Sequence, residues 1–339
     1  MKVCVVYYKS PSPFVIQDYL ILKKRHDVRL VSFLSHPFRF LFYVARSDLC
    51  VCWFADLHSA VAIGVSRILG KKSIVVAGGY DVARVPEIEY GAFVYSPVTR
   101  FSAAYALNHA DLVLAVDPSI VESAILNARI SPASARYLPT GYEAEFWRPP
   151  RSGPRPSTIV TATRVQRETV KLKGLDTFAR TAALVPEARF VIVGEVDPRV
   201  GDDLTEMAHG NLSLIGYQPQ EALVKVFQEA SVYCQLSRFE GLPNALCEAM
   251  LCGCIPVGTK AGGITTAIGD TGFFVDYGDE TATAEAIRRA LQSDDKHREE
   301  ARCRIMRLFD ISMREAGLLG FVAELRQELE AAPMMRSSD

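Results

Sequence analysis

The chain has 339 residues, of which 49% are hydrophobic and 23% are charged, and this composition is typical of globular rather than disordered proteins. Its length suffices for two ordinary domains. The formal net charge of -1 excludes the overall basic field of a general nucleic-acid binder, so we expect no nucleic-acid partner.

Short apolar runs rich in valine and isoleucine alternate with segments of helix length along the chain. Near-continuous apolar runs are typical of parallel strands that helices cover on both faces. Strands that alternate with helices favour doubly wound α/β sheets. The predicted strands cover residues 2–8, 28–33, 48–54, 72–77, 111–115, 158–162, 189–193, 211–215, 231–235 and 255–258.

The first predicted strand begins at once, without the charged and apolar regions of a secretory signal. No apolar run reaches the roughly 20 residues that a membrane helix needs. None of the eight cysteines lies in a CxxC spacing, which favours buried thiols in a reducing compartment over a metal site. We therefore expect a cytoplasmic protein.

A domain boundary is predicted at residues 148–156, where four prolines and a glycine stop both helices and strands. The first domain would cover residues 1–150 and the second residues 151–313. Clefts between domains are preferred ligand sites. A final helical pattern, at about 314–331, is long enough to return and pack on the first domain.

The most informative segment follows the predicted strand at 231–235. A loop with Gly241 and Pro243 leads to Asn244, which we expect to cap a helix that ends near residue 251. A loop after a parallel strand that leads into a helix N-terminus favours anion binding, because free amides and the helix dipole point at the ligand. Glu240 and Glu248 flank this loop, and Glu248 could accept hydrogen bonds from two vicinal hydroxyls of a ribose. Alternatively, both glutamates are ordinary surface or capping carboxylates.

This segment resembles the signature of the family 4 (group 1) retaining glycosyltransferases of the GT-B fold, E-G-x-[PG]-x-x-x-x-E-A-M-x-x-G-x-P-V. The matching residues are Glu240, Gly241, Pro243, Glu248, Ala249, Met250, Gly253, Pro256 and Val257. The resemblance implies two Rossmann-like domains that face a central cleft, with a nucleotide-sugar donor in the second domain. It also implies transfer with retention, no metal and no cofactor. It makes Glu240 a catalytic candidate, and it assigns donor binding to Gly241, Leu242, Pro243, Asn244 and Glu248.

Further positions match the same family in order. Arg164, followed by Lys173 and its neighbour Gly174, resembles the G-R…K-G-x-D pattern whose cations hold the donor diphosphate, and Tyr217 resembles the turn near the base. Fixed cations favour a transition state in which the leaving diphosphate gains charge. The alternative is two solvated cations on a loop.

The first domain departs from the family pattern. Many relatives carry H-G-x-D after a strand, whereas this chain has Gly78 at the histidine position, which leaves Asp81 as the nearest catalytic candidate. A cap or turn residue is the alternative for Asp81. His58 and His109 lie in helical segments and are interpreted as structural. In the second domain, Thr266 replaces the usual glutamate of a G-G-x-P-E turn.

Residues 36–46 combine four aromatic side chains with two arginines and could dock on an anionic membrane at its inner face. An ordinary helix packed on the first sheet is the alternative. The sequence thus predicts hexosyl transfer from a nucleoside-diphosphate sugar to a glycan or lipid-linked acceptor, in cell-envelope or exopolysaccharide synthesis. A nucleotide-sugar epimerase of the same fold and a non-catalytic sugar-nucleotide-binding protein remain alternatives.

Overall fold

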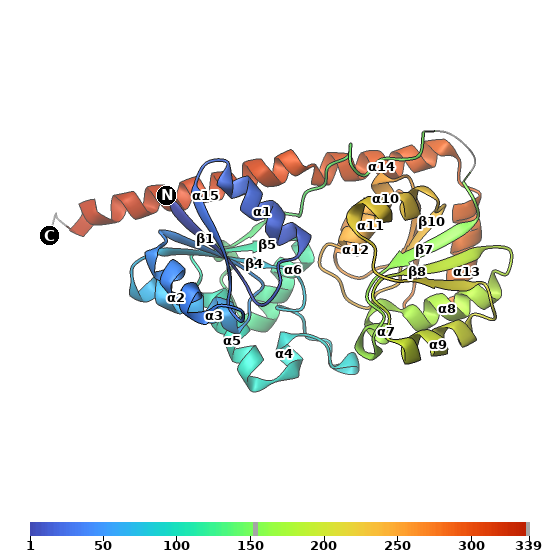
Figure 1. The fold of residues 1–339 in the computed structure, drawn as a ribbon, viewed down its shortest axis with the longest axis horizontal. Helices are drawn as coiled ribbons and strands as arrows, with labels where there is room; N and C mark the ends of the chain where they lie inside the picture. The colour runs from blue at the N-terminus through green and yellow to red at the C-terminus, as the bar shows by residue number, and fades with distance from the viewer. Residues whose placement is uncertain (152–154, 337–339) are drawn as a thin grey trace. The chain divides into compact units, whose positions relative to one another are not determined.

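A computed structural model describes residues 1–151 and 155–336 (Figure 1). The chain divides into two compact units, Met1–Gly141 with Ile311–Asp339, and Tyr142–Asp310. Each unit holds a six-stranded sheet in which all paired strands are parallel. The predicted α/β fold of two Rossmann-like doubly wound domains is therefore confirmed.

The sheet of the first unit has the order β2-β1-β3-β4-β5-β6. Strands β3 and β5 are buried along their whole length, as expected for a sheet that is covered on both faces. The short strand β6 was not predicted, because two of its three residues are exposed and give no apolar run. The strands are β1 (Lys2–Tyr7), β2 (Asp27–Ser32), β3 (Leu49–Trp53), β4 (Lys72–Ala77), β5 (Leu112–Ala115) and β6 (Ala135–Tyr137).

Most helices of this unit begin with local signals that the sequence provides. Proline occupies the start of α1, α2, α5 and α6, where its missing amide removes no helical hydrogen bond. Side chains of Asp56, Ser96 and Asp117 cap α3, α5 and α6. The α-helices are α1 (Pro13–Lys23), α2 (Pro37–Arg46), α3 (Leu57–Ile68), α4 (Ala92–Tyr95), α5 (Pro97–His109), α6 (Pro118–Ser123) and α15 (Ile311–Arg336).

The last helix, α15, packs on α1 of the first unit (Figure 1). Its Arg314 is only 1% exposed and forms two contacts with the buried carboxylate of Asp18, at 3.0 and 2.6 Å. The same carboxylate accepts from the indole of Trp53 at 2.9 Å, and Arg314 also donates to the carbonyl of Leu138 at 2.7 Å. The buried Arg314 guanidinium thus joins α15 to α1 and to Leu138, which lies near the end of the segment Met1–Gly141.

The sheet of the second unit has the order β12-β11-β10-β7-β8-β9. The chain moves outward from β7 to β9 and then returns to place β10 on the other side of β7. Ligands of open α/β sheets bind outside the carboxyl ends of the strands at such a reversal. The strands are β7 (Thr158–Ala162), β8 (Arg189–Val193), β9 (Leu212–Ile215), β10 (Val232–Gln235), β11 (Ile255–Thr259) and β12 (Phe273–Val275).

Arginines of α14 hold the surrounding helices of the second unit. Arg302 donates to the carbonyls of Leu251 and Trp147, and Arg304 donates to the carbonyl of Ala267 at 2.9 Å. Cations at helix carboxyl ends complement the helix dipole. The helices are α7 (Arg167–Lys173), α8 (Leu175–Leu184), α9 (Pro198–Met207), α10 (Gln220–Gln228), α11 (Asn244–Leu251), α12 (Gly263–Ile268), α13 (Glu280–Leu291) and α14 (Asp295–Phe309).

The units divide at residues 141/142, not at 150/151 as the prolines suggested, and α15 begins at 311. The physical reason is aromatic burial ahead of the prolines. Tyr142 and Trp147 are both buried in the second unit, where the Trp147 ring lies 6.1 Å from that of Phe227. Residues 152–154 of the proline-rich stretch lie outside the described residues. Within the described part of the chain, no helix combines the length and apolarity that crossing a membrane requires.

Candidate functional site

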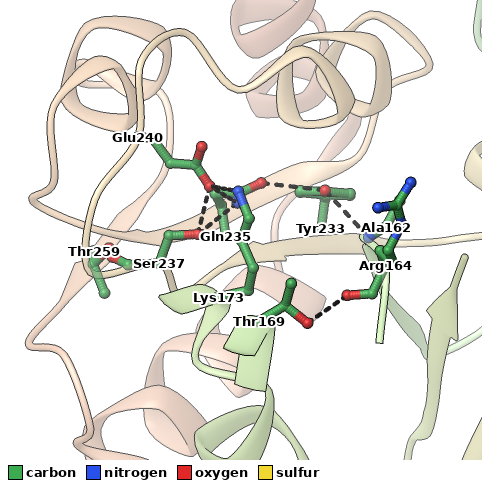
Figure 2. Close-up of polar contacts among 9 residues, drawn as sticks. All are labelled: Ala162, Arg164, Thr169, Lys173, Tyr233, Gln235, Ser237, Glu240 and Thr259. Carbon is green, nitrogen blue, oxygen red and sulfur yellow. Dashed lines mark hydrogen bonds and ion pairs between the residues drawn. The ribbon is translucent and has the colours of Figure 1, made fainter. Parts of the chain in front are cut away.

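The candidate site lies at the carboxyl ends of β7 and β10, where the strand order reverses (Figure 2). The loop after β7 carries Arg164, and the loop after β10 carries Glu240. Between α7 and α8, Gly174 adopts a left-handed φ of 63°, and a Cβ there would lie 2.3 Å from the carbonyl oxygen of Leu236. Glycine therefore lets the end of α7, with Lys173, approach the end of β10.

Three donors converge on one oxygen of Glu240 (Figure 2). Its Oε1 accepts from Lys173 Nζ at 2.6 Å, from Ser237 Oγ at 2.7 Å and from Gln235 Nε2 at 2.9 Å. The Glu240 side chain is 12% exposed. Among the described residues no donor reaches Oε2 of Glu240, so this second oxygen is free to accept a bond from a ligand.

A second layer of polar contacts holds these donors in place. Gln235 Oε1 accepts from the buried Tyr233 hydroxyl at 3.2 Å, and that hydroxyl accepts from the Ala162 amide at 3.3 Å. The Thr259 hydroxyl donates to the carbonyl of Ser237 at 2.5 Å. None of these supporting residues was predicted from the sequence. Polar residues at every second position were a signal that could have identified them, because residues 233, 235 and 237 share one face of an extended chain.

Arg164 lies at the carboxyl end of β7, in an exposed position. Its side chain is 61% exposed and forms an ion pair with the equally exposed Glu195 at 3.3 Å. The Thr169 hydroxyl donates to the Arg164 carbonyl at 2.7 Å and anchors the backbone. Exposed pairs contribute little free energy, so the guanidinium can exchange Glu195 for an anionic ligand.

Glu248 lies on α11, four residues into the helix, and is half-buried. Burial raises the pKa of its carboxyl to about 8. Among the described residues, no hydrogen bond or ion pair reaches this carboxyl. A desolvated acid without a partner is costly unless a ligand supplies hydrogen bonds.

The predicted cap of α11 is wrong. Pro243 precedes the helix and no side chain caps it, while Asn244 Oδ1 accepts instead from the hydroxyl of Tyr142 at 2.6 Å. The amides at the start of α11 have no partners within the helix, as in any helix. An anion at this end of α11 would therefore be bound by backbone amides, without the predicted Asn244 cap.

The loop ahead of α11 packs tightly. Leu242 is buried, and a Cβ on Gly263 would lie 1.9 Å from the carbonyl oxygen of Gly241. Glycine at 263 therefore permits the turn after β11 to support this loop, although Thr266 departs from the family pattern. Tyr217 follows β9 and is 76% exposed. Its predicted place beside a base stays a prediction.

Asp81, the candidate of the first unit, is 1% exposed. Its Oδ2 accepts from the Ala55 amide at 3.0 Å, and its Oδ1 accepts from the amides of Gly78 and Gly79 at 3.1 and 2.8 Å. Burial raises the pKa of Asp81, whereas these amides favour its charged form. These contacts are those of a positioning residue and do not support a catalytic role.

The two histidines considered from the sequence both lie in helices. His58 is buried in α3, where its Nε2 bonds the carbonyl of Trp53 at 2.9 Å. His109 ends α5, and its Nδ1 bonds the carbonyl of Tyr105 at 2.9 Å. Both rings are thus held by backbone carbonyls. Of the eight cysteines, only Cys303 is exposed.

Comparison with known proteins agrees with this geometry. Residues 156–293 match the family described as "Glycosyl transferases group 1". This part of the chain is thus similar to the group 1 glycosyltransferases. It contains Arg164, Lys173, Glu240 and Glu248, so the family match and the polar network coincide.

Two curated relatives place this domain in context. The chain is 24% identical over 221 residues to a phosphatidylinositol N-acetylglucosaminyltransferase component of Arabidopsis thaliana, covering 63% of the chain and 49% of the relative. It is 31% identical over 127 residues to N-acetyl-alpha-D-glucosaminyl L-malate synthase of Bacillus anthracis, covering 34% and 33%. The matches thus span half or less of these curated relatives.

Among solved structures, HepE of Anabaena, determined with UDP and glucose, has a TM-score of 0.77 at 15% identity. The alignment covers 96% of this chain and all of that one. The likeness extends over both units and confirms the GT-B fold. These matches give no support to the epimerase alternative.

Proposed function

We propose that this protein is a glycosyltransferase of family 4, which moves a sugar from a nucleoside-diphosphate sugar to an acceptor hydroxyl. The observation that carries the proposal is the convergence of Lys173, Gln235 and Ser237 on Glu240 at the strand reversal of a domain similar to the group 1 glycosyltransferases. HepE, which shares the fold, was solved with UDP-glucose, and the two curated relatives are named for N-acetylglucosaminyl chemistry. A UDP-sugar is therefore the first donor to test.

Each polar residue of the site has a chemical role in this proposal. Glu248 accepts hydrogen bonds from the ribose hydroxyls, because its carboxyl has no other described partner. Lys173 has three N–H donors and uses one on Glu240, so it can also bind a phosphate oxygen. Arg164 exchanges its exposed pair with Glu195 for the diphosphate. Glu240 offers its free Oε2 to the sugar.

We further propose that transfer proceeds with retention and without a metal ion. The leaving nucleoside diphosphate gains negative charge as the glycosidic bond breaks. Lys173, at the end of α7, and Arg164, on the loop after β7, supply positive charge where the diphosphate is proposed to lie. Charge preorganised for a transition state lowers its free energy. The product anomer, determined by NMR, and activity in the presence of a chelator test these two points.

The decisive experiment for the function has two parts. Thermal unfolding should show stabilisation of the protein by one nucleoside diphosphate, because a ligand that binds only the folded state raises its stability. The corresponding nucleotide sugar should then give transfer to a glycan or lipid-linked acceptor. Absence of stabilisation by UDP, GDP, ADP, CDP and TDP would refute the donor site. Binding without turnover on an acceptor panel would favour the non-catalytic alternative.

We also propose a cytoplasmic location with peripheral membrane contact, which supports an acceptor in cell-envelope or exopolysaccharide synthesis. The α2 surface consists of Phe38, Arg39, Leu41, Phe42 and Arg46. Phe38 is 89% exposed, Leu41 and Phe42 are also exposed, and the Arg46 guanidinium lies 4.6 Å from the Phe42 ring centre. Residues 28–47 contain no acidic side chain. Exposed rings beside arginines favour an anionic lipid surface.

Sedimentation with vesicles tests the α2 surface. The protein should sediment with vesicles that contain phosphatidylserine at low salt, and less at high salt because ions screen surface charge. Arg39→Glu with Arg46→Glu should release it, whereas the matched control Arg67→Glu with Arg129→Glu should not. Equal sedimentation of both double variants would refute this contact.

A further inference from the structure

Phe54, directly after β3, has a backbone conformation that bulky residues avoid. Its φ is 67°, in the left-handed region, where a large L side chain is a genuine outlier. Its amide donates to the carbonyl of Val76 at 2.9 Å, and the next amide, of Ala55, donates to Asp81 Oδ2 at 3.0 Å. Asp81 therefore holds the backbone at Phe54 in this strained form.

Two α3 side chains also hold this segment. His58 Nε2 bonds the Trp53 carbonyl at 2.9 Å, and Ser59 Oγ donates to the Phe54 carbonyl at 2.5 Å. Both side chains are buried. Strained backbone conformations that several contacts hold in place are concentrated at functional sites, because folding alone would favour an unstrained conformation.

The Phe54 ring occupies the space beside Gly78. A Cβ on Gly78 would lie 2.4 Å from a ring carbon of Phe54, so no residue with a side chain fits there while the ring keeps this place. The ring packs edge-on against Phe14, with centroids 5.8 Å apart, and remains half-buried. The position where relatives carry a polar imidazole is thus covered by an apolar ring.

Other aromatic residues lie at the same edge of this sheet. Tyr8 follows β1 and Tyr80 follows β4, both neighbours of β3, and both tyrosines are exposed. Burial and the charge of Asp56 raise the pKa of Tyr80, which keeps its phenol neutral and able to donate or accept a hydrogen bond. We call Tyr8, Phe14, Phe54 and Tyr80 the aromatic edge.

We propose that the aromatic edge is an acceptor subsite for an uncharged saccharide, with the Phe54 ring stacked on the C–H face of a pyranose. The negative face of an aromatic ring attracts weakly positive C–H groups, and the Tyr80 hydroxyl can bond sugar hydroxyls. Asp56 disfavours anionic acceptors at the same place. Asp81, His58 and Ser59 are positioning residues that act through Phe54. This inference rests on the proposed function and specifies its acceptor class.

Saturation-transfer NMR with a panel of methyl glycopyranosides and disaccharides tests the subsite directly. Irradiation of aromatic protons should transfer saturation to one face of a bound pyranose in the wild type. Phe54→Gly should abolish this transfer, yet the variant should fold, because glycine adopts a positive φ without strain. Phe54→Leu keeps an apolar side chain without a ring and should weaken binding at least about tenfold, equivalent to ~1.4 kcal/mol.

Matched controls separate this role from a structural one. Phe54→Tyr should retain binding, and Phe101→Ala, which removes an exposed ring on α5, should leave it unchanged. In transfer assays Phe54→Leu should raise the KM for the acceptor while leaving the KM for the nucleotide sugar unchanged. Ser59→Ala should show the same split to a smaller extent.

Three outcomes would overturn the proposal: no saccharide binds the wild type, binding survives in Phe54→Leu, or malate and glycerol phosphate bind in place of saccharides in a Phe54-dependent way. Stabilisation by nucleoside diphosphates is measured on the same samples. If nucleotides stabilise the protein and saccharides do not bind, only the acceptor inference fails. If no nucleotide stabilises it, the proposed function fails.

Discussion

Glu248→Gln tests the donor site through the half-buried acid of α11. Burial raises the pKa of this carboxyl from an ordinary 4.5 to about 8. The folded state therefore holds a proton that the unfolded state loses above pH 4.5. The protonated Glu248 carboxyl therefore contributes stability that is fully present below about pH 4.5 and is lost as the pH rises through 8. At pH 7 the free energy of unfolding is already lower by about 3 kcal/mol.

Glutamine has nearly the same shape and does not ionise, so the variant should lack this decline. Urea unfolding of both proteins at about pH 5.5, 7 and 8.5 measures the difference, which should grow with pH in favour of Glu248→Gln. Parallel stability profiles would refute the raised pKa. They would mean that water or an unrecognised partner already solvates the carboxyl.

The same substitution should weaken nucleotide binding. Hydrogen bonds to a charged group contribute about 1.5–3 kcal/mol, so the Kd of Glu248→Gln should rise roughly 10- to 100-fold at about pH 8.5. In the wild type the affinity should increase between about pH 6.5 and 8.5, because the carboxylate accepts both ribose hydroxyls only when ionised. The nucleotide itself titrates, so the glutamine variant serves as the reference in calorimetry. Equal affinities at every pH would remove Glu248 from the donor site.

Three further substitutions probe charges elsewhere in the molecule. Lys173→Met should lower kcat by roughly 10²-fold, the scale for losing one preorganised contact, with Lys171→Met as the control; wild-type turnover would place the diphosphate elsewhere. Arg164→Ala should also reduce kcat/KM, yet leave the melting temperature nearly unchanged because its pair with Glu195 is exposed; a large drop in melting temperature would contradict this reasoning. Arg314→Met should destabilise the first unit by about 3–5 kcal/mol in urea, since it leaves Asp18 buried without its cation.

The sequence predicted the regular part of the fold well, because parallel strands are apolar on both faces. The runs at 72–77, 158–162 and 189–193 coincide with β4, β7 and β8, and the other predicted strands differ from the observed ones by one residue at one or both ends. The short edge strands β6 and β12 were missed. Each has only three residues and is not fully buried, so neither gives a sustained apolar run.

The loop that carries Glu240, Gly241 and Pro243 could be predicted because these residues lie close together in the sequence, whereas the contacts that support Glu240 join separate elements. The bonds from Lys173 and Gln235 to Glu240 span 67 and five positions, and only folding brings them together. The strained φ of Phe54 has no sequence signal, because neither Phe54 nor its neighbours are residues that favour positive φ. The sequence shows a glycine at position 78, but it does not show that the Phe54 ring packs against this glycine.

The buried contact between Asp18 and Arg314 affects the order in which the chain completes its parts during synthesis. Residues 142–310 form a contiguous unit, whereas the first unit needs a helix that follows residue 310. The ribosome therefore delivers all residues of the second unit before the first unit can bury Asp18 against its cation. The amino-terminal sheet is synthesised first, but the first unit can complete its packing only after the last helix, α15, has been synthesised.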